Sequence, residues 1–237
     1  MRKFFARYKR FAIVLSLLSI VIIYLMYNAL KPVERLPIYQ PASLNPDLVD
    51  STLHYTKKYH TIADFKLTNQ NGKTITQKAY EGKIYIADFF FTTCPSICPI
   101  MTKNMLTIQE ATINDDDIML LSHSVTPQID SVAQLKKYAL EKGVIDSKWN
   151  LVTGDKKQIY ELARKSYFAV LDDGDGGAFD MIHTENFILI DKEKRIRGTY
   201  DGTNKDEIEK LLKDLEILRA SYKPQASFFG FFKLHLP

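Results

Sequence analysis

Two cysteines, Cys94 and Cys98, stand four positions apart in the segment Thr93-Cys94-Pro95-Ser96-Ile97-Cys98-Pro99, and they are the only cysteines in the sequence. A close pair of this kind can form a disulfide, act as a redox dithiol or bind a metal. As a structural cross-link it would contribute little, because so small a loop barely constrains the unfolded chain. As ligands, two thiolates favour Cu(I), zinc or iron–sulfur chemistry.

Pro99, directly after the second cysteine, constrains how the pair is presented. Proline disfavours helical backbone at the residue before it and suits the first position of a helix. We therefore expect a helix to begin at Pro99, with Cys98 at its cap and Cys94 in the preceding loop. The unpaired N–H groups at such a helix end help to stabilise a thiolate.

A metal site needs a third ligand, and three histidines of the folded region are candidates. His123 lies inside the apolar segment 118–125, so we expect it in the core. His60 stands at the end of a proline-containing segment, and we expect it to be solvated. His183 lies between an acidic, glycine-rich loop (172–180) and a predicted strand, and its position alone fits a ligand and a simple loop histidine equally well.

One absence bears on the choice between redox and metal chemistry. Thioredoxin-type oxidoreductases place a cis-proline opposite the dithiol, yet no proline stands between Pro127 and Pro224. The segment 181–185, which contains His183, occupies the corresponding place. The three-residue spacer between the cysteines also departs from the C-x-x-C of most disulfide exchangers. Both features favour a metal site over dithiol exchange.

The elements that must position the cysteines alternate between strand-like and helical patterns. An apolar, aromatic run at 84–91 is typical of a strand covered on both faces, and the cysteine segment follows it directly. The other expected elements are a hairpin at 62–67 and 74–76, helices at 101–113, 130–142 and 155–167, strands at 118–125 and 149–152, a closing hairpin at 186–191 and 195–200, and a last helix that Asn204 caps.

This alternation predicts an α/β fold, with a central mixed sheet flanked by helices. A dithiol at the C-terminal end of the first long strand is the thioredoxin-like arrangement. It also agrees with the general rule that sites lie beyond the carboxyl ends of sheet strands.

The N-terminus predicts a membrane anchor. Residues 1–10 contain five basic and no acidic residues, and residues 11–30 are an uncharged, mostly apolar run of about 30 Å as a helix. A cleaved signal peptide is the alternative, but no small-x-small site follows the run. The basic tip stays cytoplasmic, so we expect a single-pass protein of the inner membrane whose soluble domain faces the periplasm or an equivalent space. The rest of the chain is nearly neutral, which gives no argument for nucleic-acid binding.

Three further segments complete the expected organisation. Residues 31–58 contain recurring prolines and predict an extended tether, and residues 59–221 form the thioredoxin-like domain. Residues 222–237 form an aromatic tail that lies on the membrane or a partner, or is simply mobile. The acidic loop at 172–180 lacks the spacing of a calcium-binding loop, so we interpret it as solvated.

The cysteine segment and its surroundings resemble the Sco/SenC family of copper-assembly proteins for cytochrome c oxidase. The resemblance runs from about residue 36 to 220 and is carried by the following segments: Leu36–Tyr39, Asn71–Lys73, Phe89–Pro99, Ser124–Asp130, and His183 ahead of Phe187–Asp191. It implies a thioredoxin-like fold and one copper ion held by Cys94, Cys98 and His183. It also implies a role in building the oxidase copper centre, with a copper-receiving oxidase subunit as one partner and an upstream copper donor or thiol reductant as another.

The sequence departs from the family pattern at three positions where an acid is usual: Ser96, Thr126 and Ile182. These changes remove negative charge, so a fourth, oxygen ligand for Cu(II) is in doubt and we expect Cu(I) to be held better. On this interpretation the protein is a metallochaperone and not an enzyme. The alternative is a thiol–disulfide oxidoreductase that acts on partner cysteines through the same sulfurs; peroxide reduction is a third hypothesis that no further feature supports.

Overall fold

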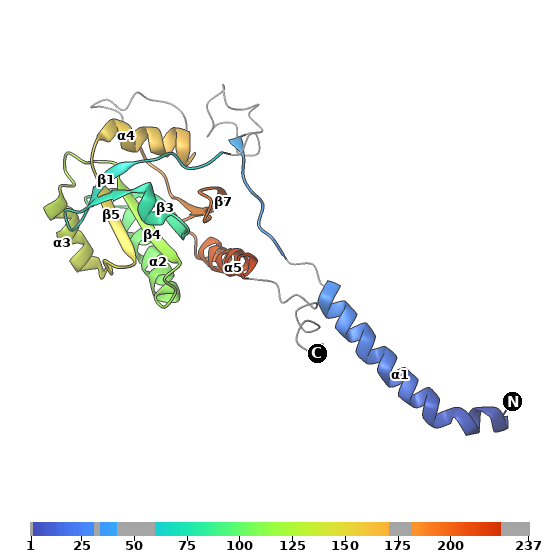
Figure 1. Ribbon diagram of the computed structural model, residues 1–237. Coiled ribbons are helices and arrows are strands. Elements are labelled where there is room, and N and C mark those ends of the chain that lie inside the picture. Colours follow the sequence, from blue (N-terminus) through green and yellow to red (C-terminus); the bar gives the residue numbers. More distant parts are fainter. Residues whose placement is uncertain (1, 31–33, 42–59, 171–181, 224–237) are drawn as a thin grey trace, which may run out of the picture. The chain divides into compact units, whose positions relative to one another are not determined.

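The computed structural model describes residues 2–30, 34–41, 60–170 and 182–223, and it divides into two compact units (Figure 1). The first unit contains α1 (Arg2–Leu30), whose apolar stretch Tyr8–Asn28 has a mean hydropathy of 2.2. Twenty-one helical residues extend about 32 Å, which is enough to cross a bilayer. This supports the predicted anchor, although a signal sequence shares the same character.

The second unit, Leu36–Ala220, is built on a seven-stranded mixed sheet of order β2-β1-β5-β4-β3-β6-β7. β3 pairs in parallel with β4 and β4 with β5, whereas β3–β6, β6–β7, β1–β5 and β1–β2 are antiparallel. The strands are β1 (Lys66–Asn69), β2 (Thr74–Thr76), β3 (Ile84–Phe90), β4 (Ile118–Ser124), β5 (Trp149–Thr153), β6 (Asn186–Ile190) and β7 (Ile196–Asp201). The predicted α/β architecture with a central mixed sheet is confirmed.

Helices cover both faces of this sheet (Figure 1). Every residue of β3 is buried, and its side chains alternate: Tyr85, Ala87 and Phe89 face the core beneath α4, while Phe90 packs against Tyr138 of α3. The helical segments are η3 (Gln77–Tyr80), α2 (Ile97–Thr112), α3 (Val132–Lys142), α4 (Lys156–Glu161), the π-helical turn η4 (Leu162–Ser166) and α5 (Lys205–Ser221). The apolar character of the whole strand, noted in the sequence, follows from this double coverage.

The helix boundaries mostly lie where capping residues predict them. The side chains of Ser131 and Asp155 accept hydrogen bonds from backbone N–H groups in the first turns of α3 and α4. Gly143 ends α3 in the left-handed conformation, with φ of 80°, as expected for a C-terminal glycine. The Asn204 side chain accepts from the N–H of Asp206 at the start of α5. The predicted caps at Asp155 and Asn204 and the predicted end of α3 at Gly143 are confirmed, whereas α3 begins at Val132, two residues after its predicted start.

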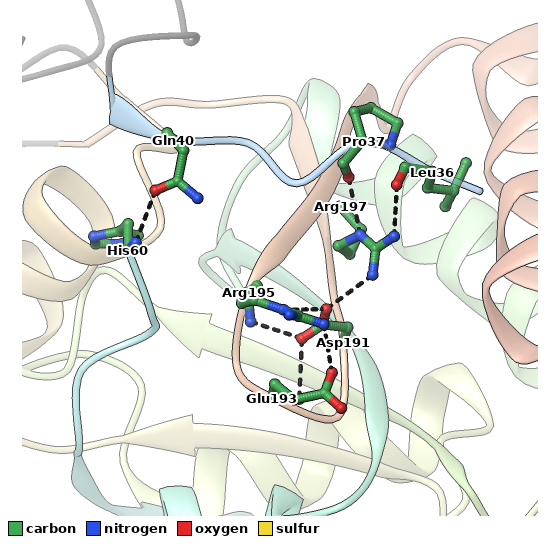
Figure 2. Close-up of polar contacts among 8 residues, drawn as sticks. All are labelled: Leu36, Pro37, Gln40, His60, Asp191, Glu193, Arg195 and Arg197. Atoms are coloured by element: carbon green, nitrogen blue, oxygen red, sulfur yellow. Dashed lines mark hydrogen bonds and ion pairs between the residues drawn. The ribbon is translucent and has the colours of Figure 1, made fainter. Parts of the chain in front are cut away.

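Part of the predicted tether lies against the domain, and we call residues 36–40 the strap (Figure 2). The backbone N–H of Tyr39 donates to the carbonyl of Ile196 in β7 at 2.9 Å, and the Tyr39 side chain packs on the core. The guanidinium of Arg197 donates to the carbonyls of Pro37 and Leu36, at 2.9 and 2.6 Å. The strap therefore covers the exposed edge of β7 and belongs to the compact unit, which begins at Leu36 instead of at the expected residue 59.

Candidate functional site

The cysteine pair lies where β3 ends and α2 begins, at the carboxyl end of a central strand. Cys94 is in the connecting loop and is half-buried, whereas Cys98 is 3% exposed. The N–H of Cys94 donates to the carbonyl of Phe91 at 3.3 Å, which turns the loop back on itself. Both cysteines are free thiols, so the structure represents the reduced pair.

The start of α2 differs from the sequence-based expectation. The helix begins at Ile97, with Ser96 at the N-cap position, so Cys98 is inside the first turn and is not the cap. Pro99 is accommodated there because the backbone N–H groups of the first helical turn have no acceptor within the helix. The N–H that proline lacks therefore costs no hydrogen bond. The Ser96 hydroxyl lies 3.8 Å from the Cys94 sulfur and makes no capping bond to the helix. The prediction of a loop position for Cys94 is confirmed, and that of a cap position for Cys98 is wrong.

The two thiols have opposite acid–base properties. Burial opposes ionisation of Cys94, but hydrogen bonds from the backbone and side chains of Cys98 and Ser96 outweigh it and lower its pKa to about 7. Burial, together with the nearby Cys94 and Asp88, raises the pKa of Cys98 to about 12. The pair therefore combines an accessible thiolate near neutral pH with a buried thiol that keeps its proton.

Alkylation should separate the two thiols in the metal-free, reduced protein. The iodoacetamide reaction of Cys94 is expected to rise about tenfold between pH 6 and pH 8 and to level off above that, because the thiolate accumulates as the pH passes its pKa. Cys98 should stay unmodified over this range, as mass spectrometry of the Cys94→Ser variant will report. A rate that still climbs steeply at pH 9 would show that Cys94 has an ordinary thiol pKa.

Asp88 lies on β3 behind the buried cysteine, and sequence reasoning did not single it out. Its carboxylate is 3% exposed, and Oδ1 has no hydrogen-bond partner among the described residues. Burial raises its pKa to about 7, against a hydrogen bond with Ser122 that lowers it. The sequence feature that could have identified Asp88 is its position as the single acidic residue inside an apolar, aromatic strand, six positions before Cys94. A deprotonated Asp88 adds to the effect of burial in raising the pKa of the Cys98 thiol.

His183 lies beside the loop that carries Cys94 but does not complete a ligand set with the two cysteines. Its exposed ring is edge-on to the ring of Phe91, with 6.0 Å between centroids. Among the residues that the structure describes, no three His, Cys, Asp or Glu side chains are grouped to hold a metal ion. The acidic loop expected at 172–180 lies outside the described residues. The assignment of His183 as a third ligand therefore stays a prediction.

The other two histidines are not part of this site. His123 is fully buried in β4, stacked on Phe89 at 4.8 Å, and burial lowers its pKa to about 4, which confirms the predicted core position. The prediction that His60 is solvated is wrong. His60 is half-buried: its ring nitrogen is 2.6 Å from the carbonyl of Ser166, its ring contacts Phe168, and burial lowers its pKa. The contacts with Ser166 and Phe168 explain the difference, and the His60 backbone N–H also donates to the Gln40 side chain of the strap (Figure 2).

Comparison with known proteins identifies the family. The SCO1/SenC family model matches residues 54–218, well over half of the chain. This protein belongs to the SCO1/SenC family. A SCO1 protein homolog of Bacillus subtilis (strain 168) is 30% identical over 159 residues, and the match covers 66% of this chain and 82% of that protein.

Two solved structures of family members are also similar. BsSco, a member of the Sco family of cytochrome c oxidase assembly proteins with a disulfide switch, has a TM-score of 0.59 at 29% identity, covering 70% of this chain and 96% of that one. The copper-bound structure of Bradyrhizobium japonicum ScoI has a TM-score of 0.53 at 27% identity, covering 67% and 99%. The predicted thioredoxin-like fold and the Sco/SenC resemblance are both confirmed.

Within this SCO1/SenC domain, the three positions that lack the usual acid hold uncharged groups near the site. Ser96 offers a hydroxyl to the Cys94 sulfur, and Ile182 is 3% exposed immediately before His183. Thr126 is buried and donates its hydroxyl to Asp130 at 3.1 Å. None of these side chains carries a charge, and the expected preference for Cu(I) stays a prediction.

Proposed function

We propose that this protein is a copper-binding metallochaperone for the assembly of cytochrome c oxidase, with copper as its cargo. The observation that carries the proposal is the pair of cysteines between the end of β3 and the first turn of α2, where the hydrogen bonds around Cys94 lower the pKa of its thiol to about 7. Two sulfur donors suit Cu(I). Copper is bound in the structure of ScoI, and BsSco is a cytochrome c oxidase assembly protein, so both relatives support this function.

In this proposal Cys94, Cys98 and His183 are the copper ligands. Cys94 offers its thiolate with little cost of deprotonation at neutral pH, whereas Cys98 must release a proton when copper binds. His183 needs to move from its position against Phe91 toward the sulfurs, and its exposure permits this. The bound copper supplies no catalysis here; it is transferred to the copper-receiving subunit of the oxidase.

We further infer that α1 anchors the protein in the inner membrane and that the domain faces the periplasm or an equivalent compartment. The basic tip, residues 1–10, precedes the uncharged run of residues 11–30, and positive flanks stay on the cytoplasmic side. Copper then arrives from an upstream donor, or electrons arrive from a thiol reductant, on the outer side. The predicted aromatic tail lies outside the described residues from 224 onward.

A thiol–disulfide oxidoreductase is the second candidate, and one observation favours it. Cys94 has the accessible, low-pKa thiol of an attacking nucleophile, and Cys98 has the buried, protonated thiol of a resolving group. The disulfide switch identified in BsSco agrees with such chemistry. His183 separates the two functions, because it is a ligand in the first and has no role in the second.

Copper loading of the detergent-solubilised full chain tests the proposal. Under anaerobic, reducing conditions we expect about one Cu(I) per chain, lost in Cys94→Ser and Cys98→Ser and weakened at least a hundredfold in His183→Ala, since removing one of three ligands leaves a poor site. His235→Ala, in the C-terminal segment, serves as the histidine control and should load normally. Loading that is unchanged in His183→Ala would reject the ligand set, and no loading of the wild type would favour the oxidoreductase.

A further inference from the structure

A buried carboxylate outside the proposed ligand set lies under the loop of the first cysteine. Asp130 follows β4 in the connection to α3 and is 0% exposed. Its Oδ2 accepts from the Ser124 hydroxyl at 2.6 Å, the Thr126 hydroxyl at 3.1 Å and the backbone N–H of Thr92 at 3.2 Å, and its Oδ1 accepts from the Thr92 hydroxyl at 2.5 Å. Two of these four bonds go to one residue of the dithiol loop.

This carboxylate is held by neutral donors alone. Among the described residues, no Lys, Arg or His side chain lies within ion-pair distance of Asp130. Three of the four donors bond to Oδ2 and one to Oδ1, so both carboxyl oxygens have partners without a cation. The carboxylate keeps these partners only while each donor stays in position. The two hydrogen bonds between Asp130 and Thr92 therefore fix the position of each residue relative to the other.

Thr92 connects Asp130 to the loop of Cys94. Thr92 is two residues before Cys94, and its hydroxyl also accepts from the Gln134 side chain of α3 at 3.0 Å. The backbone N–H of Asp130 donates to the carbonyl of Thr126 at 2.8 Å, which closes the β4–α3 turn on itself. The dithiol loop is thereby joined to α3 and to the turn after β4, in addition to its covalent attachment to β3 and α2.

We propose that Asp130 is a positioning residue that, through Thr92, holds the Cys94 loop so that the Cys94 sulfur stays within reach of Cys98. The inference rests on the proposed use of these two sulfurs, but it concerns their relative placement and not the identity of the cargo. Loss of the contact removes neither cysteine, but it allows the Cys94 loop to move. The effective concentration of the Cys94 sulfur at Cys98 then falls.

Disulfide formation measures this effective concentration directly. In exchange with glutathione disulfide, Cys94 and Cys98 together lose two protons and two electrons to form one S–S bond, and the glutathione disulfide becomes two glutathione thiols. The equilibrium constant compares the dithiol and the disulfide forms of Cys94 and Cys98 in the same protein. If Asp130 only stabilised the fold, replacing it would leave this equilibrium constant unchanged, provided that the reduced and the disulfide-bonded protein both stay folded.

Substitutions at both ends of the contact have graded consequences. In Asp130→Asn the fixed N–H of Thr92 keeps the amide oxygen on its side, so the amide nitrogen faces the Thr92 hydroxyl. The hydroxyl proton then loses its acceptor, and the hydrogen bond to a carboxylate is replaced by a weaker one from the amide to the hydroxyl oxygen. Thr92→Val removes the hydroxyl at nearly constant shape, and Thr92→Ser restores it. Asp191→Asn is the matched control, because Asp191 is a buried carboxylate with several partners and no contact to this loop.

The test is glutathione equilibration of the metal-free full chain in detergent, with each variant confirmed as folded by circular dichroism. We expect the equilibrium constant for disulfide formation to fall about tenfold in Thr92→Val and Asp130→Asn, and to stay within twofold of wild type in Thr92→Ser and Asp191→Asn. Values within twofold for all variants would overturn the proposal. So would an equal fall in Asp191→Asn, and if Asp130→Asn does not fold, Thr92→Val decides.

Copper loading of the same variants keeps this result separate from the proposed function. If the wild type binds one Cu(I), a weaker competition against a Cu(I) chelator in Thr92→Val supports the positioning role a second time, and an unchanged one opposes it. If the wild type binds no copper, the copper function fails, while the glutathione equilibrium still decides the role of Asp130.

Discussion

Arg197→Ala is expected to lower the free energy of unfolding by about 3 kcal/mol, because it leaves a buried carboxylate short of a cation and releases the strap. The Arg197 side chain is 7% exposed, and its Nη1 is 2.9 Å from Oδ2 of Asp191, which is itself fully buried (Figure 2). The remaining partners of Asp191 are Arg195, at 2.8 Å, and the N–H groups of the following turn. These partners keep the loss near the lower end of the range for a broken buried pair.

Urea unfolding and hydrogen exchange of the same samples measure both parts of this prediction. The amide of Tyr39, which donates to Ile196, should exchange faster in Arg197→Ala than in wild type. Arg197→Lys keeps the charge but cannot reach three acceptors, so an intermediate value is expected. Lys137→Ala, which removes an exposed ion pair with Glu141, should cost less than 0.5 kcal/mol. Unchanged stability together with unchanged Tyr39 exchange would show that the strap is not held by Arg197.

The strap shows where sequence patterns lose their predictive power. Recurring prolines and the lack of an apolar period predict an extended tether, but they cannot show that Tyr39 adds to the edge of β7. That contact depends on Arg197, which lies more than 150 positions away in the sequence. His60 also appears solvated from its neighbours alone, but residues distant in the sequence cover its ring, namely Ser166 and Phe168. By contrast, the double coverage of β3 and the end of α3 at Gly143 are visible locally.

The candidate site also has some features that the local sequence predicts and others that only the fold creates. Two cysteines in a loop after a buried strand are predictable, because spacing and strand pattern are local properties. The helix start was misplaced by two residues because the preference of a residue before proline is statistical, and Cys98 adopts helical backbone regardless. The roles of Asp88 and Asp130 depend on which donors surround a buried carboxylate, and only the fold brings Ser122 to the first and Thr92 to the second.

Asp88→Asn is expected to remove a large pH dependence of stability between about pH 4 and pH 7. Burial raises the pKa of Asp88 from 3.8 to about 7, so between these values the folded chain retains a proton that the unfolded chain has lost. Stability from this group is therefore complete below pH 4 and falls as the pH rises through 7. Asparagine cannot ionise, so the variant should gain about 3 kcal/mol relative to wild type between pH 4.5 and pH 8.5.

Urea unfolding of the reduced, metal-free protein at the two pH values provides the measurement. At pH 4.5 the variant should be slightly less stable, because its amide nitrogen takes the place of the Oδ1 atom that has no partner among the described residues. At pH 8.5 it should be more stable, so the sign of the difference reverses. Asp64→Asn, an exposed carboxylate beside Lys194, should shift stability by less than 1 kcal/mol at both pH values. A pH-independent difference for Asp88→Asn would show that Asp88 is ionised throughout.

The same variant connects this buried carboxylate to the chemistry of the site. A charged Asp88 is one of the groups that raise the pKa of Cys98, so removing the charge should lower that pKa and make the buried thiol easier to deprotonate. If Cys98 is a copper ligand that must give up its proton, Cu(I) should then bind more tightly in Asp88→Asn than in wild type at pH 8 and about equally at pH 5, where Asp88 is neutral in both. Equal affinities at pH 8 would mean that Asp88 affects only the stability of the fold.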